Sequence, residues 1–203
     1  MPNYGVQDVT ISITQIGDLI LTSGRLLAWD LLMVPDSRYS FKRTLNPGRY
    51  PVVLSVANFL PVNDTRIACA RLLINEHSPV RWEAALVDEP NPDSGGRYSY
   101  GVDSGTGSFM DVDVARILAP LVWEESRDGD RFEEFCGPVL VQMDEHSFGA
   151  HKTAGWANVK VSDDTSANVI TFSSGWGDGG YASFWGYDEA GNVASLVTDF
   201  ALF

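Results

Sequence analysis

The sequence has few basic residues and no long apolar run. Only 14 of its 203 residues are Lys or Arg, against 27 that are Asp or Glu, so the formal net charge is −13. No run of about 18 apolar residues occurs, and we therefore expect no membrane-spanning helix. The N-terminus has no basic region followed by an apolar one, so we expect no secretory signal and a cytoplasmic protein.

The acidic surplus is concentrated in the second half of the chain. Residues 1–102 hold nine basic and ten acidic side chains, a net charge of −1, and residues 103–203 hold five and seventeen, a net charge of −12. A field of this sign repels nucleic acid and anionic membranes, and it attracts a basic protein or metal cations. The alternative is that the charge only keeps the chain in solution.

Cysteine and histidine are also scarce, which argues against a zinc site. Cys69 and Cys136 show no Cys-x-x-Cys spacing and no nearby histidine cluster. Glu133 and Glu134 precede Cys136 and disfavour the thiolate that a nucleophile needs. In a cytosolic protein we expect two thiols, although the sequence leaves a disulfide between them open.

Alternation of apolar and polar residues predicts a mainly β protein, because a period of two is typical of half-buried strands. Strands are expected at residues 9–14, 19–22, 25–30, 49–56, 66–74, 80–87, 168–172, 182–187 and 193–198. A helix is expected at 111–118, with Asp111 as its N-cap and Pro120 ending it. A second is expected at 130–135, and residues 139–143 fit either type. The pattern predicts a sandwich or a bent, barrel-like antiparallel sheet with two or three short helices.

The segment 88–96 is the most loop-like part of the chain, with two prolines and two glycines. An internal seam would lie there, since the charge balance changes at nearly the same place. No linker separates two halves of about 100 residues each, so we expect residues 1–203 to form a single domain with a shared core.

The first segment that could carry chemistry is Asp103-Ser104-Gly105-Thr106-Gly107. The order Asp-Ser-Gly-Thr resembles the catalytic turn of aspartic proteases, but that chemistry needs two carboxylates sharing a proton, and only one copy is present. The plain alternative is a glycine turn whose Asp accepts bonds from backbone N–H groups. Between the two lies a site that presents Asp103 as a ligand or base, with Ser104 and Thr106 as binding residues.

Three carboxylates, Asp103, Asp111 and Asp113, form a candidate site for a divalent cation. Their oxygens are the ligands that Ca²⁺ and Mg²⁺ prefer, although the EF-hand spacing is absent. The alternative is helix capping and solvent exposure. No other cofactor is indicated.

The third segment, residues 173–181, holds four glycines around Asp178. Glycine permits close backbone approach and positive φ, so this loop could present N–H groups to an anion or hold Asp178 rigidly. The alternative is a bulged β connection whose aromatic side chains cover a sheet edge. We expect Trp176, Tyr181 and Trp185 to contribute to a binding surface here.

Four groups of residues carry a family resemblance. They are Ser23-Gly24-Arg25-Leu26 with Asp30, Pro47-Gly48-Arg49-Tyr50-Pro51-Val52, Val102 to Gly107, and the tail from Ser174-Gly175-Trp176-Gly177-Asp178-Gly179 through Trp185-Gly186 to Leu196-Val197-Thr198-Asp199-Phe200. On these motifs the chain resembles, nearly end to end, the domain-of-unknown-function family 4241, found mainly in bacteria. The resemblance implies one domain in a bacterial, intracellular protein, and it brings no established activity.

Two classes of function follow from these observations. The leading hypothesis is a non-catalytic acidic binding protein, for example one that neutralises a basic toxin or nuclease, since the acidic half would speed encounter with a cationic surface. The alternative is a hydrolase in which Asp103 and Asp178 act with a divalent cation or as an acid/base pair, which requires both in one cleft. Neither nucleic acid nor a membrane is expected as a partner.

Overall fold

The computed structural model describes residues 8–33, 37–89, 99–123, 129–162 and 164–203. The strands are β1 (Val9–Leu21), β2 (Leu26–Trp29), β3 (Gly48–Phe59), β4 (Asp64–Leu73), β5 (Arg81–Ala84), β6 (Ser99–Val102), β7 (Thr106–Asp111), β8 (Trp156–Lys160), β9 (Asn168–Ser173), β10 (Gly179–Tyr187) and β11 (Val193–Asp199). The α-helices are α1 (Val112–Trp123) and α2 (Gly129–Glu145), and short 3₁₀ turns are η2 (Leu31–Met33), η3 (Ser37–Tyr39) and η4 (Leu60–Val62). The predicted mainly β class is confirmed.

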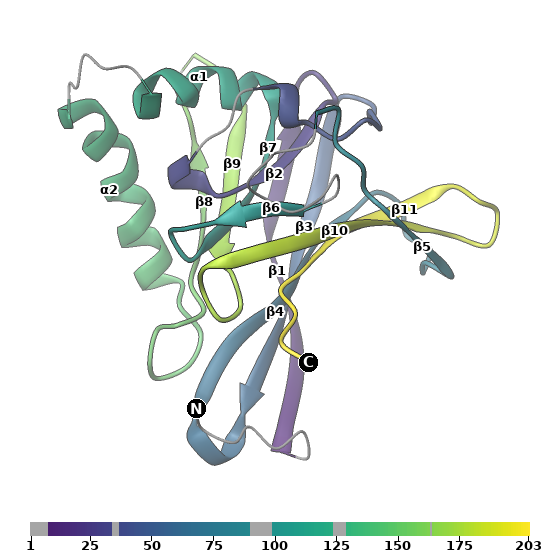
Figure 1. Cartoon of the computed structure of the whole chain (residues 1–203), viewed down its shortest axis with the longest axis vertical. Coiled ribbons are helices and arrows are strands. Elements are labelled where there is room, and N and C mark those ends of the chain that lie inside the picture. Colours follow the sequence, from purple (N-terminus) through teal and green to yellow (C-terminus); the bar gives the residue numbers. More distant parts are fainter. Residues whose placement is uncertain (1–7, 34–36, 90–98, 124–128, 163) are drawn as a thin grey trace.

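The larger sheet has seven strands, all paired antiparallel. Its order is β1-β3-β4-β11-β10-β5, and β6 pairs with the opposite end of the same edge of β10. The long strands β1, β3 and β4 extend below the rest of the molecule, whereas β10 and β11 run from its middle to the side away from α2 (Figure 1). One face of this sheet packs on the core, and the other is open.

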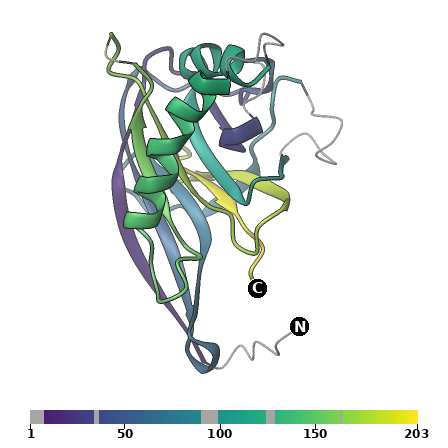
Figure 2. The ribbon, with the colours of Figure 1, turned by 90° about the vertical axis from the view of Figure 1, so that its left-hand side faces the viewer.

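The smaller sheet has four antiparallel strands in the order β2-β7-β9-β8. It stacks on the inner face of the larger sheet, and the helices lie beside it, α1 against β7 and α2 along β8 (Figures 1 and 2). Every side chain of β2 and β7 is buried. These short strands are therefore enclosed on both faces, which suits the wholly apolar sequence of β2. In β7 the buried Ser108 hydroxyl is satisfied by the carbonyl of Trp29, at 2.7 Å.

A single apolar cluster fills the space between the sheets and draws on residues from Ile16 to Phe200. Its largest fully buried aromatic side chains are Phe109, Phe172 and Phe200. Both halves of the sequence therefore supply the same core. The seam expected at 88–96 lies mostly outside the described residues.

Strand β1 differs from its prediction, because a break at Gly17 was expected and the strand runs through it. The register against β3 shifts between Gln15 and Gly17, so Ile16 is the extra residue of a bulge that Gly17 completes. Its φ is +138°, and the amide of Asn158 lies where a side chain would be. The bulge keeps one long strand continuous past a neighbour from the other sheet.

Both helices are longer than predicted. Asp111 does cap α1, since its Oδ1 accepts the backbone N–H of Asp113 at 2.8 Å. The prediction that Pro120 ends α1 is wrong, because the helix continues to Trp123. Pro120 lies in the last turn, where its missing N–H removes only one of the final bonds. Residues 139–143 are helical and extend α2 well beyond 130–135.

In the described part of the chain, neither helix has the length and hydropathy to cross a membrane.

Replacing Gly17 with alanine is expected to destabilise the protein by about 1–3 kcal/mol, because L side chains rarely adopt its φ. The new Cβ would also lie 2.4 Å from Asn158 Nδ2. The matched control is Gly101→Ala in β6, whose Cβ meets no atom of the described chain within 4 Å. Urea denaturation measures both variants, and equal effects would contradict the role given to the bulge.

Candidate functional site

The carboxylate of Asp30 holds the turn that contains Asp103. Asp30 is fully buried, just after β2. Its Oδ2 accepts the backbone N–H groups of Asp103 and Ser104, each at 2.8 Å. Its Oδ1 accepts the Ser104 hydroxyl, the Thr106 hydroxyl at 3.4 Å and the Leu32 N–H at 3.0 Å. Five donors thus satisfy the buried carboxylate of Asp30. Their hydrogen bonds offset the free energy lost when the charge leaves water, and they fix the turn.

The glycine-rich loop is fastened to this turn. The N–H of Ser174 donates to the carbonyl of Gly105 at 3.0 Å. The Tyr181 hydroxyl donates to the carbonyls of Ser174, at 3.1 Å, and Gly177, at 2.7 Å. Gly177 has a φ of +107°, and its Cα would lie 3.8 Å from a Cβ on Gly105. The two segments thus approach each other closely.

Asp103 and Asp178 flank the end of the β6–β10 ladder. The last pair of that ladder is Val102 with Gly179, so Asp103 directly follows one partner and Asp178 directly precedes the other. Both carboxylates are exposed. The structure therefore brings the two candidate acids to the same end of two paired strands, on segments that are themselves hydrogen-bonded together.

Of the five predicted binding residues, three hold the turn and the loop by hydrogen bonds, one is buried and one is exposed. Ser104 and Thr106 bond to Asp30, and Tyr181 fixes the loop. Trp185 is 3% exposed and packs edge-on against the ring of Phe41, so it offers a ligand little direct contact. Trp176 is 42% exposed.

The surroundings of Trp176 set its ring in place. Phe59 lies 5.6 Å from it between centroids, and the Arg66 guanidinium lies 5.2 Å from its centre. Of the predicted aromatic residues, Trp176 is therefore the one that presents a face to solvent.

The structure does not bring Asp103 together with the other two acids of the candidate cation site. Asp103 precedes β7, whereas Asp111 ends it. Asp111 is fully buried and accepts the N–H of Ser23 at 3.0 Å and its hydroxyl at 2.6 Å. Asp113 accepts the Thr22 hydroxyl. Within the described ranges, no three His, Cys, Asp or Glu side chains are grouped to hold a metal ion.

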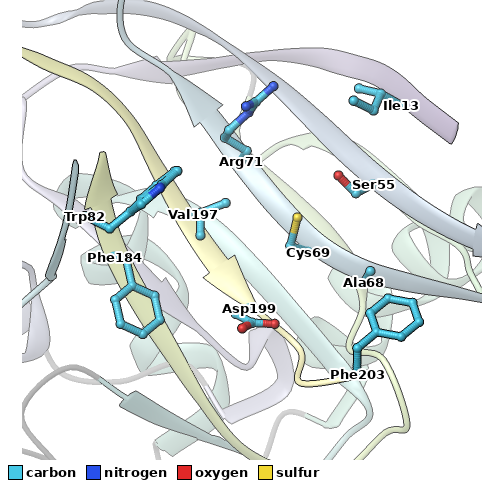
Figure 3. A pocket seen from close by; sticks show the side chains of 10 residues that line it. All are labelled: Ile13, Ser55, Ala68, Cys69, Arg71, Trp82, Phe184, Val197, Asp199 and Phe203. Atoms are coloured by element: carbon cyan, nitrogen blue, oxygen red, sulfur yellow. The ribbon is translucent and has the colours of Figure 1, made fainter. Parts of the chain in front are cut away.

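The open face of the larger sheet carries a groove of about 570 Å³ (Figure 3). The side chains that line this outer groove are Ile13, Ser55, Ala68, Cys69, Arg71, Trp82, Phe184, Val197, Asp199 and Phe203. Ile13, Trp82 and Phe203 are 64%, 45% and 70% exposed. Apolar side chains gathered on an open surface in this way are typical of a binding site.

Two rows of cross-strand neighbours form the floor of the outer groove. Ile13 pairs with Ser55, Ser55 with Cys69 and Cys69 with Asp199. The next row joins Arg71 to Val197 and Val197 to Phe184. These residues could not be recognised from the sequence, because they come from five strands and only the pairing order places them on one face. The available signal was the alternation within each strand, which marks a face but not its neighbours.

The floor of the outer groove holds one carboxylate, one guanidinium and one thiol. Burial raises the pKa of the Cys69 thiol, and the nearby carboxylate of Asp199 adds to the rise. Burial also raises the pKa of Cys136, to about 11. Both cysteines are free. Neither thiol is activated as a nucleophile, so the outer groove is suited to non-covalent binding.

Fold and site together define a two-sheet, antiparallel β protein with an open groove on the larger sheet and a turn fixed by the buried Asp30. The chain belongs to the family described as protein of unknown function (DUF4241), whose model matches residues 19–198. Neither the curated proteins nor the solved structures give a match.

Asp30→Asn is expected to destabilise the protein by about 2–3 kcal/mol, because an amide nitrogen would face backbone donors and leave them unpaired. The matched control is Asp88→Asn, an exposed carboxylate 3.3 Å from Arg25, with an expected loss below about 1 kcal/mol. Urea unfolding compares the two. An Asp30→Asn protein as stable as the wild type would show that this carboxylate does not hold the turn.

Proposed function

We propose that this protein is a non-catalytic binding module that captures a basic, partly apolar polypeptide segment on the outer groove. The observation that carries the proposal is the groove itself, with exposed apolar walls and Asp199 on its floor. An extended segment with alternating side chains fits such a surface, because apolar side chains would cover the walls and a cation would meet Asp199. Arg71 would meet a carbonyl or carboxylate of the same segment.

Charge supports a basic partner. The net charge of −13 would attract a cationic surface from a distance, and the exposed carboxylates of Asp103, Asp178 and Asp199 have no ion-pair partner within the described residues. Ala182 pairs with Asp199, and β10 begins directly after Asp178, so one strand links these acids. A basic toxin or nuclease, neutralised by being covered, is a partner of this chemistry.

A labelled peptide of alternating lysine and leucine is the probe for this function. Its affinity is expected to fall about tenfold between about 20 mM and about 200 mM NaCl, because the attraction is screened. Asp199→Asn and Trp82→Ala are each expected to weaken binding at least about threefold. Fluorescence anisotropy measures these affinities.

The control is Asp164→Asn, which removes an equally exposed carboxylate that does not line the groove. It should bind as the wild type does. Equal affinity for a peptide of alternating glutamate and leucine, or affinity that salt does not change, would overturn the proposal.

A hydrolase remains a second candidate function because Asp103 and Asp178 lie at the same end of β6 and β10. Two carboxylates so close in the ladder could share a divalent cation that activates water, or could act as acid and base. The turn fixed by Asp30 and the loop fixed by Tyr181 would position them.

This second function predicts that about 5 mM MgCl₂ or CaCl₂ raises the Tm by about 2 °C or more, because a bound cation stabilises the folded state. Asp103→Asn and Asp178→Asn should each abolish the rise, whereas Asp164→Asn should retain it. Differential scanning fluorimetry measures all four proteins. If neither metal changes the Tm of the wild type, the cation-dependent hydrolase is excluded.

A further inference from the structure

A second cavity, of about 360 Å³, lies where β1 of the larger sheet meets β8 and β9 of the smaller one. It shares no lining residue with the outer groove. Its lining residues are Ile16, Asp18, Ile20, Arg49, Gln142, His146, Trp156, Asn158, Lys160, Ser166 and Asn168. Most of them are polar, in contrast to the apolar outer groove.

A network of amides builds the floor of this polar cavity. Asn168, only 4% exposed, donates to the Asn158 Oδ1 at 2.7 Å and to the Asp18 carbonyl at 2.9 Å. Its own Oδ1 accepts the N–H of Ile20 at 2.8 Å. The Gln142 Oε1 accepts the N–H of Asn158 at 2.6 Å, which leaves the Gln142 amide N–H₂ as a donor. The floor is therefore a fixed set of groups and is not a chance gap between side chains.

Two basic side chains and one acidic side chain line this cavity, whereas acidic side chains outnumber basic ones in the whole chain. Arg49 and Lys160 line it, and Asp18 is the one carboxylate among its lining residues. Asp18 lies 3.6 Å from Arg49, which is a weak, exposed pair. Lys160 has no ion-pair partner in the described part of the chain. Arg49, Lys160 and Gln142 together give the cavity more hydrogen-bond donors than acceptors.

Two stacked rings form one wall. The centroids of His146 and Trp156 lie 4.2 Å apart, with 22° between the ring planes. His146 Nδ1 is buried and has no hydrogen-bond partner among the described residues. The stacked rings thus give the cavity an aromatic wall.

We propose that this cavity binds a phosphomonoester of a small organic molecule. A phosphate offers several acceptor oxygens in different directions, which suits donors that come from β3, β8 and α2. The cavity is larger than a phosphate alone needs, so the organic part would occupy the remainder, against Trp156. The net charge of −13 does not prevent this, because charges beyond about 8 Å are largely screened at physiological ionic strength, while Arg49 and Lys160 contact the ligand.

Isothermal titration calorimetry with inorganic phosphate, ribose 5-phosphate, AMP and adenosine tests the proposal. Both phosphomonoesters are expected to bind more tightly than inorganic phosphate, and adenosine more weakly than AMP. AMP tighter than ribose 5-phosphate would identify a nucleotide, and the reverse order would identify a sugar phosphate. Absence of binding by both esters up to about 10 mM would overturn the proposal.

Variants locate the site. Lys160→Gln and Arg49→Gln are each expected to weaken the tighter ester at least about fivefold, because each removes a charged contact to phosphate. Lys42→Gln is the matched control, with the same loss of one positive charge at an exposed position outside the cavity, and should change affinity less than about twofold. Equal effects of all three substitutions would mean that only net charge matters, and the site would be rejected.

Discussion

The buried carboxylate of Asp30 is the interaction on which the arrangement of the acidic surface depends. A charge without water is stable in a protein only when donors surround it, and here four of the five donors come from the turn at 103–106. The carbonyl of Gly105 in this turn accepts the N–H of Ser174, near the start of the glycine-rich loop. One carboxylate at the end of β2 therefore positions two segments from distant parts of the chain, including the exposed Asp103 and Asp178.

Local pattern was sufficient to predict the class of fold and most of its elements. Alternation located β3, β9, β10 and β11 to within a few residues, and Asp111 was recognised as a cap because its side chain acts on neighbouring residues. The continuity of β1 through Gly17 could not be predicted, because the residue that lies closest to Gly17 there, Asn158, comes from the other sheet. Both helices were also predicted too short, and for α1 the reason was that Pro120 was expected to end a helix that continues to Trp123.

The candidate sites also differ in whether local sequence could reveal them. The turn at 103–107 and the loop at 173–181 could be singled out from composition. Asp30, which holds the turn, was noted only as part of a family motif, and nothing next to it in the sequence indicates this role. Neither the outer groove nor the polar cavity could be predicted from the sequence, because each is made of side chains that become neighbours only through strand pairing and sheet stacking. The chain thus has a mainly apolar groove on the open face of the larger sheet and a mainly polar cavity, lined by Arg49 and Lys160, where the two sheets meet.

The distance along the chain between Asp30 and its donors has a kinetic consequence. The carboxylate and the N–H of Asp103 are 73 residues apart in sequence, so the chain must close a long loop before that bond can form. Contacts of this kind form late in folding, after the shorter hairpins such as β10–β11. An unfolded chain would have the same net charge of −13 but not the ordered turn. Recognition through this surface would thereby report that folding is complete.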